Sequence, residues 1–211
     1  VRCLAGPGDG LIRIDPPGGP RWDTTANATW NRAKRSVVLD LHRVEDLATA
    51  RSLVDRADVL IENFRPGVMD RLGFSYEELK RVKEDIILFS MPATGLYGPL
   101  KDIRTYGLSL TSTTGLDSLG GYAEGDILPV ENAFSDPYNG IFGAFAILTA
   151  LAHRNRTGEG QQIDFSQQEA VMQMVGPAFA DYALNGRVAG PLGNRHPRAM
   201  AAPHGVFPCR G

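Results

Sequence analysis

The sequence of 211 residues is poor in cysteine, and that scarcity already excludes some classes of protein. It has only two cysteines, Cys3 and Cys209, which lie near opposite ends and show no Cys-x-x-Cys or Cys/His spacing. A disulfide framework and a zinc site are therefore not supported. A reducing, cytoplasmic location is the corresponding expectation.

An excess of charge of one sign is also missing. The 22 Lys and Arg residues are balanced by 24 Asp and Glu residues, so the formal net charge is −2. Proteins that bind nucleic acid normally carry a basic surface that displaces counterions from phosphates. The balance of charge argues against nucleic acid as a partner.

Long hydrophobic runs are absent as well. The longest apolar run, residues 141–152, has twelve residues, whereas a membrane-spanning helix needs about 20. The run predicts a buried core helix, and no association with a membrane is expected. The first residues have neither the charged start nor the apolar stretch of a signal peptide, so none is expected there.

Glycine and proline are plentiful, and hydrophobic runs alternate with helical patterns. Short runs rich in Val, Ile and Leu predict buried parallel strands at residues 36–41, 58–62 and 85–90, and a fourth at 11–14. Helical spacing is found at residues 44–56 and 69–82, the latter broken at Leu72-Gly73 with Ser75 as N-cap. The alternation predicts an α/β fold, with a Rossmann-like open parallel sheet and flanking helices.

The second half of the chain is predicted to be mostly helical, over residues 140–154 and 166–184. A glycine-containing turn and a short strand at 156–164 separate the two helices. There is no internal repeat and no linker long enough to require a domain boundary. We therefore expect residues 1–211 to form a single α/β segment.

Ligands of open parallel sheets bind outside the carboxyl ends of the strands, so the loops after those ends are candidate sites. The loop after Glu62 contains Asn63, Phe64 and Arg65: an amide, an aromatic ring and a guanidinium suited to a base and phosphates. The alternative is that Phe64 lies in the core and Arg65 pairs with Glu62. A glycine-rich loop, residues 91–99, follows the next strand and either wraps a substrate or is an ordinary connection.

Asp136 and Pro137 belong to the segment 133–140, which comes directly before the long apolar run. Asp at the N-cap with Pro at the first helical position is a common helix start. The same place, beside a positive helix end, would keep a carboxylate ionised and able to attack a carbonyl. Both interpretations of Asp136 remain open at this point.

Several familiar catalytic motifs are missing. The sequence contains no Gly-x-Ser-x-Gly elbow, no P-loop and no Gly-x-Gly-x-x-Gly, which disfavours hydrolase, kinase and nicotinamide-dependent enzymes. His153, His196 and His204 form no nucleophile–base pair that can be recognised from the sequence.

Taken in order, six stretches of the sequence resemble the class III CoA-transferases (CaiB/BaiF), the family of formyl-CoA transferase, carnitine CoA-transferase and α-methylacyl-CoA racemase. The matching stretches are residues 31–41, 57–69, 70–73, 156–164, 193–197 and 202–208. The resemblance implies that residues 1–211 are the N-terminal, CoA-binding part of that family's large domain. It also implies that the chains of the family continue past the position of residue 211 and that they form an interlocked homodimer.

The resemblance assigns roles to individual residues. It implies that coenzyme A, bound as an acyl-CoA substrate, is contacted by Leu39, Asp40, Leu41, Asn63, Phe64, Arg65, Arg71, Arg104 and Tyr106. Asp136 falls on the family's nucleophilic aspartate. It would attack the thioester to give an aspartyl-acyl anhydride and then an aspartyl-CoA thioester, from which a carboxylic acid collects the CoA.

The racemase branch of the family is the first alternative. Its catalytic His lies in a Gly-His-Asp string, where this sequence has Thr105-Tyr106-Gly107. A tyrosine side chain ordinarily has a pKa of about 10 and is a poor base at neutral pH. Transfer of CoA is therefore favoured over an acyl-CoA racemase or isomerase. A non-catalytic acyl-CoA-binding subunit is the second alternative.

Overall fold

The structure, a computed structural model, describes residues 10–18, 25–195 and 202–210. The chain divides into two compact units, Val1–Asp102 with Gly140–Phe165 and Ile103–Asn139 with Ser166–Gly211. The division falls between Asn139 and Gly140, inside one long helix. Cys3 and His196 lie outside the described residues, whereas Cys209 is an exposed, free cysteine.

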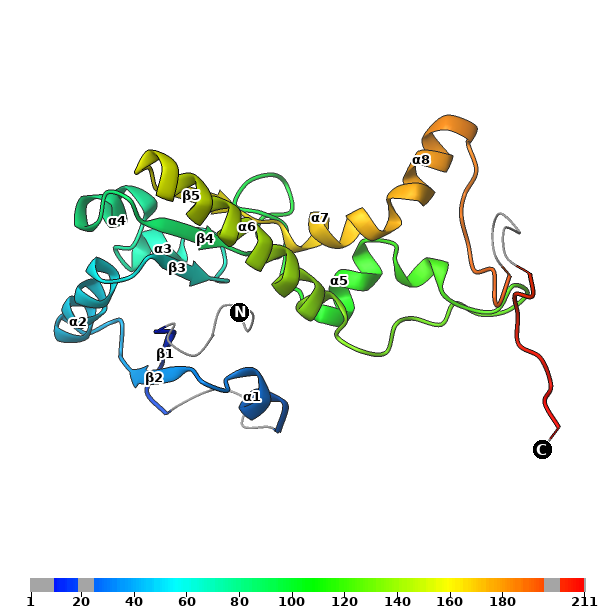
Figure 1. The fold of residues 1–211 in the computed structure, drawn as a ribbon, viewed down its shortest axis with the longest axis horizontal. Coiled ribbons are helices and arrows are strands. Elements are labelled where there is room, and N and C mark those ends of the chain that lie inside the picture. The colour runs from blue at the N-terminus through cyan, green and yellow to red at the C-terminus, as the bar shows by residue number, and fades with distance from the viewer. Residues whose placement is uncertain (1–9, 19–24, 196–201, 211) are drawn as a thin grey trace. The chain divides into compact units, whose positions relative to one another are not determined.

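All the strands of the first unit are parallel (Figure 1). β1 (Ile12–Asp15) pairs with β2 (Arg35–Val38), and β3 (Val59–Glu62), β4 (Ile87–Ser90) and β5 (Gln161–Asp164) form a second sheet in the order β3-β4-β5. The predicted α/β class, with parallel strands flanked by helices, is confirmed. The described strands form two sheets, whereas the sequence predicted one.

β2 ends at Val38, before the predicted end at residue 41, because the backbone then bonds to side chains. The Asp40 N–H donates to the Asp46 carboxylate at 2.8 Å, and the His42 N–H donates to the Asp40 carboxylate at 3.0 Å. Such local bonds replace the hydrogen bonds of a ladder. The chain turns here into α2 (Val44–Asp55).

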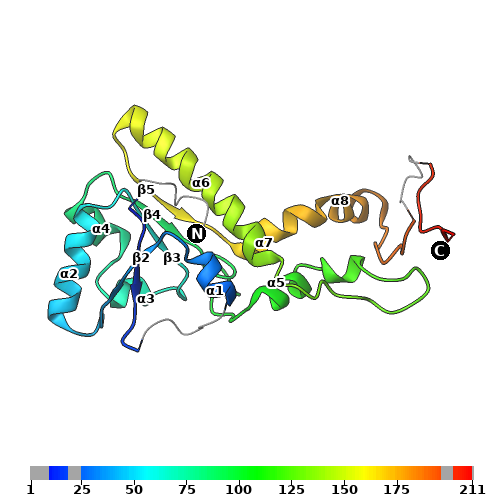
Figure 2. The ribbon, with the colours of Figure 1, turned by 60° about the horizontal axis from the view of Figure 1, so that its bottom comes forward.

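β4 is the central strand, and all four of its residues are buried. Leu88 belongs to a core cluster that it shares with α2 and α4 (Tyr76–Val82). Phe89 lies against α6 (Ser135–Thr157), where a Cβ added to Gly143 would come within 2.9 Å of the ring. Successive strand residues point to opposite faces, so α2 and α4 cover one face of this sheet and α6 covers the other (Figure 2).

The predicted break between two helical pieces is confirmed. α3 (Val68–Arg71) and α4 are separated by Gly73, whose φ of +74° is a conformation that favours glycine. Ser75 is the N-cap of α4: its Oγ accepts the Glu78 N–H at 3.3 Å, and the Glu78 carboxylate accepts the Ser75 N–H at 3.2 Å. This reciprocal pair is a capping box.

The second unit is helical in its described residues. Its elements are α5 (Gly107–Thr113), the 3₁₀ turn η1 (Asp117–Leu119), the start of α6, α7 (Gln167–Met172), the 3₁₀ turn η2 (Gln173–Val175) and α8 (Gly176–Asn185). The helix predicted over 166–184 is broken at η2. Pro177 has no N–H to donate to the Gln173 carbonyl four residues earlier, so a continuous α-helix loses a bond there.

α6 is buried on one face only, so the prediction that residues 141–152 form a buried core helix holds for one face of the helix and not for the other. Ile147 is fully buried, whereas Ile141, Phe145 and Leu148 are 62%, 71% and 54% exposed. The three exposed residues follow helical spacing and form an apolar stripe. Separately, none of the helices in the described ranges combines the length and hydropathy that crossing a bilayer requires.

We predict that Gly160→Ala separates β4 from β5. A Cβ at Gly160 would lie 2.5 Å from the Asp85 carbonyl carbon and 2.7 Å from its oxygen, and it would also meet the Ile86 oxygen. Backbone atoms can yield only if the strands move, so the free energy of unfolding should fall by about 2–3 kcal/mol. Urea denaturation followed by circular dichroism measures the change.

Gly158→Ala is the matched control. Gly158 has a φ of +80° and nothing within 4 Å of an added Cβ, so its substitution carries backbone strain alone. We expect a loss of about 1 kcal/mol. Equal losses for the two variants would contradict the packing argument.

Candidate functional site

The loop after β3 is held by the residue that ends the strand, Glu62. The Phe64 N–H donates to the Glu62 carboxylate at 2.6 Å. Asn63, Phe64 and Arg65 are exposed, with 45% of Phe64 accessible to solvent. The interpretation that Phe64 lies in the core is therefore wrong, and the loop leaves an amide, a ring and a guanidinium accessible.

Arg65 does not pair with Glu62 either. Its Nη2 lies 3.6 Å from Oδ1 of Asp102, and both side chains are largely exposed. Exposed ion pairs of this kind contribute less than about 1 kcal/mol, so a ligand phosphate can displace Asp102. Arg71 lies beside the same loop, with Nη1 3.5 Å from the place that a Cβ on Gly67 would take.

The segment after β2 has a different character. Leu39 is buried in the core cluster, and Leu41 packs against that cluster. Asp40 is partly exposed, and its carboxylate accepts the His42 N–H. A ligand at this segment would meet Asp40 and the backbone, while the leucine side chains hold the segment to the core.

Polar side chains end all three strands of the larger sheet. Glu62, Ser90 and Asp164 occupy the last positions of β3, β4 and β5 and are register partners. Burial raises the pKa of Glu62, hydrogen bonds from Ser90 and the Phe64 amide oppose the rise, and the Asp164 and Asp70 carboxylates add to it. This row was not predicted from the sequence. Its signal is a polar residue at the carboxyl end of each of the three strands.

In the second unit, Asp136 is the second residue of α6 and is not its N-cap. The Phe134 carbonyl accepts the Tyr138 N–H at 3.3 Å, so the helix begins one residue before Asp136. Ser135 is fully buried, and its hydroxyl donates to the Gly107 carbonyl at 2.7 Å. This bond places the start of α6 against α5 and overturns the capping interpretation of Asp136.

Gly107 lies near the Asp136 carboxylate, a proximity that was not predicted from the sequence. A Cβ on Gly107 would lie 3.0 Å from Asp136 Oδ1 and 2.8 Å from the Ala133 Cβ. Glycine is unfavourable in a helix, so Gly107 at the first position of α5 is the signal that was available. Asp136 lies at the surface, yet burial by its surroundings raises the pKa of its carboxyl.

Arg104 and Tyr106 lie just before α5, in the same unit as Asp136. Tyr106 is 74% exposed, and its N–H donates to Ser109 Oγ at 2.8 Å. Arg104 is exposed. Tyr106 precedes Gly107, so the structure brings it to the segment that touches Asp136. The predicted site residues thus fall into two groups: Arg104, Tyr106 and Asp136 in this unit, and the others in the first unit.

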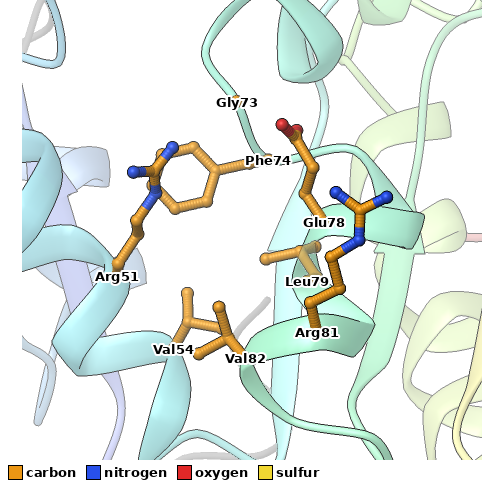
Figure 3. Close-up of a pocket in the computed structure, with 8 residues that line it drawn as sticks. All are labelled: Arg51, Val54, Gly73, Phe74, Glu78, Leu79, Arg81 and Val82. Carbon is orange, nitrogen blue, oxygen red and sulfur yellow. The ribbon is translucent and has the colours of Figure 1, made fainter.

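A cavity of about 230 Å³ lies between α2 and α4 in the first unit (Figure 3). It is lined by Arg51, Val54, Gly73, Phe74, Glu78, Leu79, Arg81 and Val82. The Arg51 guanidinium lies over the Phe74 ring, 6.0 Å from its centroid. None of the predicted site residues lines this cavity. In the described part of the chain, no three His, Cys, Asp or Glu side chains are grouped to hold a metal ion.

Comparisons with known proteins agree on one family. The family model for CoA-transferase family III matches residues 4–211. The chain is 37% identical over 207 residues to the acetyl-CoA:oxalate CoA-transferase of Acetobacter aceti, covering 93% of this chain and 53% of that protein. It is 35% identical over 178 residues to the succinate–glutarate CoA-transferase of Agrobacterium fabrum, covering 84% and 44%.

A solved structure supports the same conclusion. A CAIB/BAIF family protein from Brucella suis superposes with a TM-score of 0.83 at 30% identity, covering 93% of this chain and 55% of that one. The chain thus spans about half the length of the curated relatives it matches.

We predict that Asp136→Asn does not weaken the fold at neutral pH. The raised pKa means that the folded protein holds this proton more tightly than the unfolded chain, so stability falls as pH rises through the two pKa values. At pH 7 the ionised carboxylate is unfavourable, and its replacement should raise the melting temperature by about 1–3 °C. At pH 3, where the carboxyl is protonated in both states, the gain should vanish.

Thermal unfolding from pH 3 to pH 7 measures this difference. Asp126→Asn, which removes an exposed carboxylate of the same unit, is the control for loss of one surface charge. A lower melting temperature for Asp136→Asn at pH 7 would show that the carboxylate stabilises the fold, against our account.

Proposed function

The chain belongs to CoA-transferase family III, and from that membership we propose that it takes part in transferring coenzyme A between carboxylic acids, with Asp136 as the nucleophile. The observation that carries the assignment of Asp136 is its place: an accessible carboxyl in the first turn of α6, against Gly107 and outside any capping role. The proposal treats residues 1–211 as one CoA-binding segment of a larger domain.

The chemistry proceeds by attack of an Asp136 carboxylate oxygen on the carbonyl carbon of an acyl-CoA thioester. The C–S bond breaks, CoA leaves as a thiolate, and an aspartyl-acyl anhydride remains. The thiolate then attacks the aspartyl carbonyl, which releases the donor acid and forms an aspartyl-CoA thioester. The acceptor carboxylate attacks the carbonyl carbon of that thioester, which frees the CoA thiolate and leaves an anhydride between Asp136 and the acceptor. The thiolate then attacks the acceptor carbonyl of this anhydride, which forms the new acyl-CoA and regenerates the Asp136 carboxylate.

Partial withdrawal of Asp136 from water fits this role. A carboxylate with fewer water molecules around it is a stronger nucleophile, and the intermediates are lost if water reaches them. Glycine at position 107 is consistent with the proposal, because a Cβ there would lie 3.0 Å from Oδ1 and crowd the carboxylate.

Coenzyme A carries a base and several phosphates, which suits the exposed groups of the first unit. Phe64 offers a ring for the adenine, and Arg65 and Arg71 offer guanidinium groups for the phosphates. Asn63 adds an amide, and the segment Leu39, Asp40 and Leu41 adds backbone groups. Arg104 and Tyr106 in the second unit complete the proposed set, near the reacting thioester. This chemistry calls for no metal.

The proposed partners are small molecules. The relatives named above are acetyl-CoA:oxalate and succinate–glutarate transferases, so oxalate, succinate and glutarate are the first acids to test. Neither nucleic acid nor a membrane is a proposed partner, and the cytoplasm remains the proposed location. Association into a homodimer is also proposed. The exposed apolar stripe of α6, Ile141, Phe145 and Leu148, supports it, because such patches mark interaction surfaces.

We predict that acetyl-CoA leaves a covalent adduct on Asp136. The protein is incubated with acetyl-CoA, trapped with hydroxylamine or borohydride, digested and analysed by mass spectrometry. The peptide containing Asp136 should carry the mass change, and Asp136→Asn should abolish it and reduce CoA transfer by roughly 10³-fold or more. Asp126→Asn is the control and should behave as the unsubstituted protein. Full transfer by Asp136→Asn would refute the assignment.

An isotope experiment with the same protein distinguishes CoA transfer from the two alternatives, racemisation and binding without catalysis. In D₂O with a branched acyl-CoA and an acceptor acid, a transferase moves CoA to the acceptor and leaves the α-hydrogen in place. Entry of deuterium at the α-carbon without movement of CoA would favour a racemase or isomerase. Binding of CoA without either reaction, unchanged in Asp136→Asn, would favour a non-catalytic binding subunit.

A further inference from the structure

The carboxyl edge of the larger sheet carries two carboxylates that each hold a loop. Glu62, Ser90 and Asp164 are neighbours in register across β3, β4 and β5. Side chains in register on adjacent parallel strands point to the same face, about 4.8 Å apart. Glu62 is only 8% exposed and Ser90 only 2%. The three side chains therefore form a polar row at the strand ends from which the loops continue.

Glu62 holds the first loop. Its carboxylate accepts the Phe64 N–H at 2.6 Å and a hydrogen bond from the Ser90 side chain. The bond to Phe64 reaches across only two residues, so it closes a tight turn around Asn63. A hydrogen bond to an ionised acceptor is about twice as strong as a neutral one. The backbone that carries Phe64 and Arg65 is thereby kept in one conformation.

Asp164 holds the second loop in the same way. Both oxygens of its carboxylate accept the Leu96 N–H, at 2.9 and 3.1 Å. Leu96 lies in the middle of the glycine-rich loop that follows β4, and the Thr94 hydroxyl donates to the Leu100 carbonyl at 2.7 Å within that loop. Asp102 lies shortly after this second loop, and its ion pair with Arg65 links it to the first loop.

We propose that Glu62 and Asp164 are positioning residues for acyl-CoA: their carboxylates hold the backbone of the two loops so that Phe64 and Arg65 meet the ligand preformed. The proposal rests on the proposed function, because it assumes that coenzyme A binds at Asn63, Phe64 and Arg65. Neither carboxylate needs to touch the ligand. Their effect is on affinity, since a loop ordered beforehand loses less entropy on binding.

The proposal predicts a pH dependence of binding with a definite sign. Burial raises the pKa of Glu62, and the groups facing it are the Ser90 hydroxyl on β4, the Asp164 carboxylate on β5 and the Asp70 carboxylate on α3. As the pH falls, Glu62 takes up its proton at a higher pH than an ordinary glutamate does. The neutral acid is a weaker acceptor for the Phe64 N–H, so the affinity for CoA should fall as the pH is lowered from neutral and Glu62 takes up its proton.

The test measures binding of coenzyme A to the 211-residue chain by isothermal titration calorimetry. Glu62→Gln keeps the shape and removes the charge, and we expect its Kd for CoA to rise roughly tenfold. Asp164→Asn should raise the Kd severalfold; because Asp164 is exposed, this variant keeps the test valid if Glu62→Gln does not fold. Glu84→Gln, at an exposed glutamate just before β4, is the matched control and should bind as the unsubstituted protein.

Two further readouts separate positioning from a merely structural role. Binding by Glu62→Gln should weaken less on acidification than binding by the unsubstituted protein, while the part of the pH dependence that comes from the ligand phosphate remains in both. In turnover with acetyl-CoA, KM should rise while kcat stays the same. Hydrogen exchange at the Phe64 amide should be faster in Glu62→Gln, whether or not CoA is present.

The outcomes divide cleanly. Weaker binding with faster exchange at Phe64 supports the proposal. Faster exchange with an unchanged Kd, or a loss confined to kcat, overturns the positioning role and leaves the proposed function standing. Failure of the unsubstituted chain to bind CoA overturns the assumed ligand site, and the positioning proposal with it.

Discussion

The burial of β4 on both faces is the constraint on which the first unit depends. Leu88 faces the core formed with α2 and α4, and Phe89 faces α6, so a shift of one residue in register would exchange the two faces. β3 and β5 pair with β4 in this one register. The positions of Glu62 and Asp164 at the carboxyl edge follow from it, and so do the loops that these carboxylates hold.

Local signals in the sequence were sufficient for much of this framework. The Val/Ile/Leu runs predicted β3 and β4 because a strand covered on both faces is apolar throughout. Ser75 predicted the start of α4 because a capping box depends on residues only three positions apart. The loop after β3 was a candidate site from its position after a parallel strand, but whether Phe64 lies in the core or at the surface stayed open until the structure showed it exposed.

The features that the sequence did not predict depend on contacts that local patterns do not report. The helix start at Ser135 is set by a bond to Gly107, 28 positions earlier, which no local pattern reports. Whether Glu62 pairs with Arg65 stayed open in the sequence, because a backbone N–H two residues away competes with the Arg65 side chain and the loop geometry decides between them. The two faces of α6 have similar composition, so only the structure shows which one packs on the sheet.

The proposed division of labour follows the two units: recognition of coenzyme A by exposed groups of the first, and attack by Asp136 of the second. The most direct test is a crystal structure of Asp136→Asn with acetyl-CoA. The account predicts Arg65 on the phosphates and the substituted side chain at position 136 about 3–3.5 Å from the thioester carbonyl carbon. A thioester bound out of reach of position 136, or CoA bound away from Asn63, Phe64 and Arg65, would contradict it.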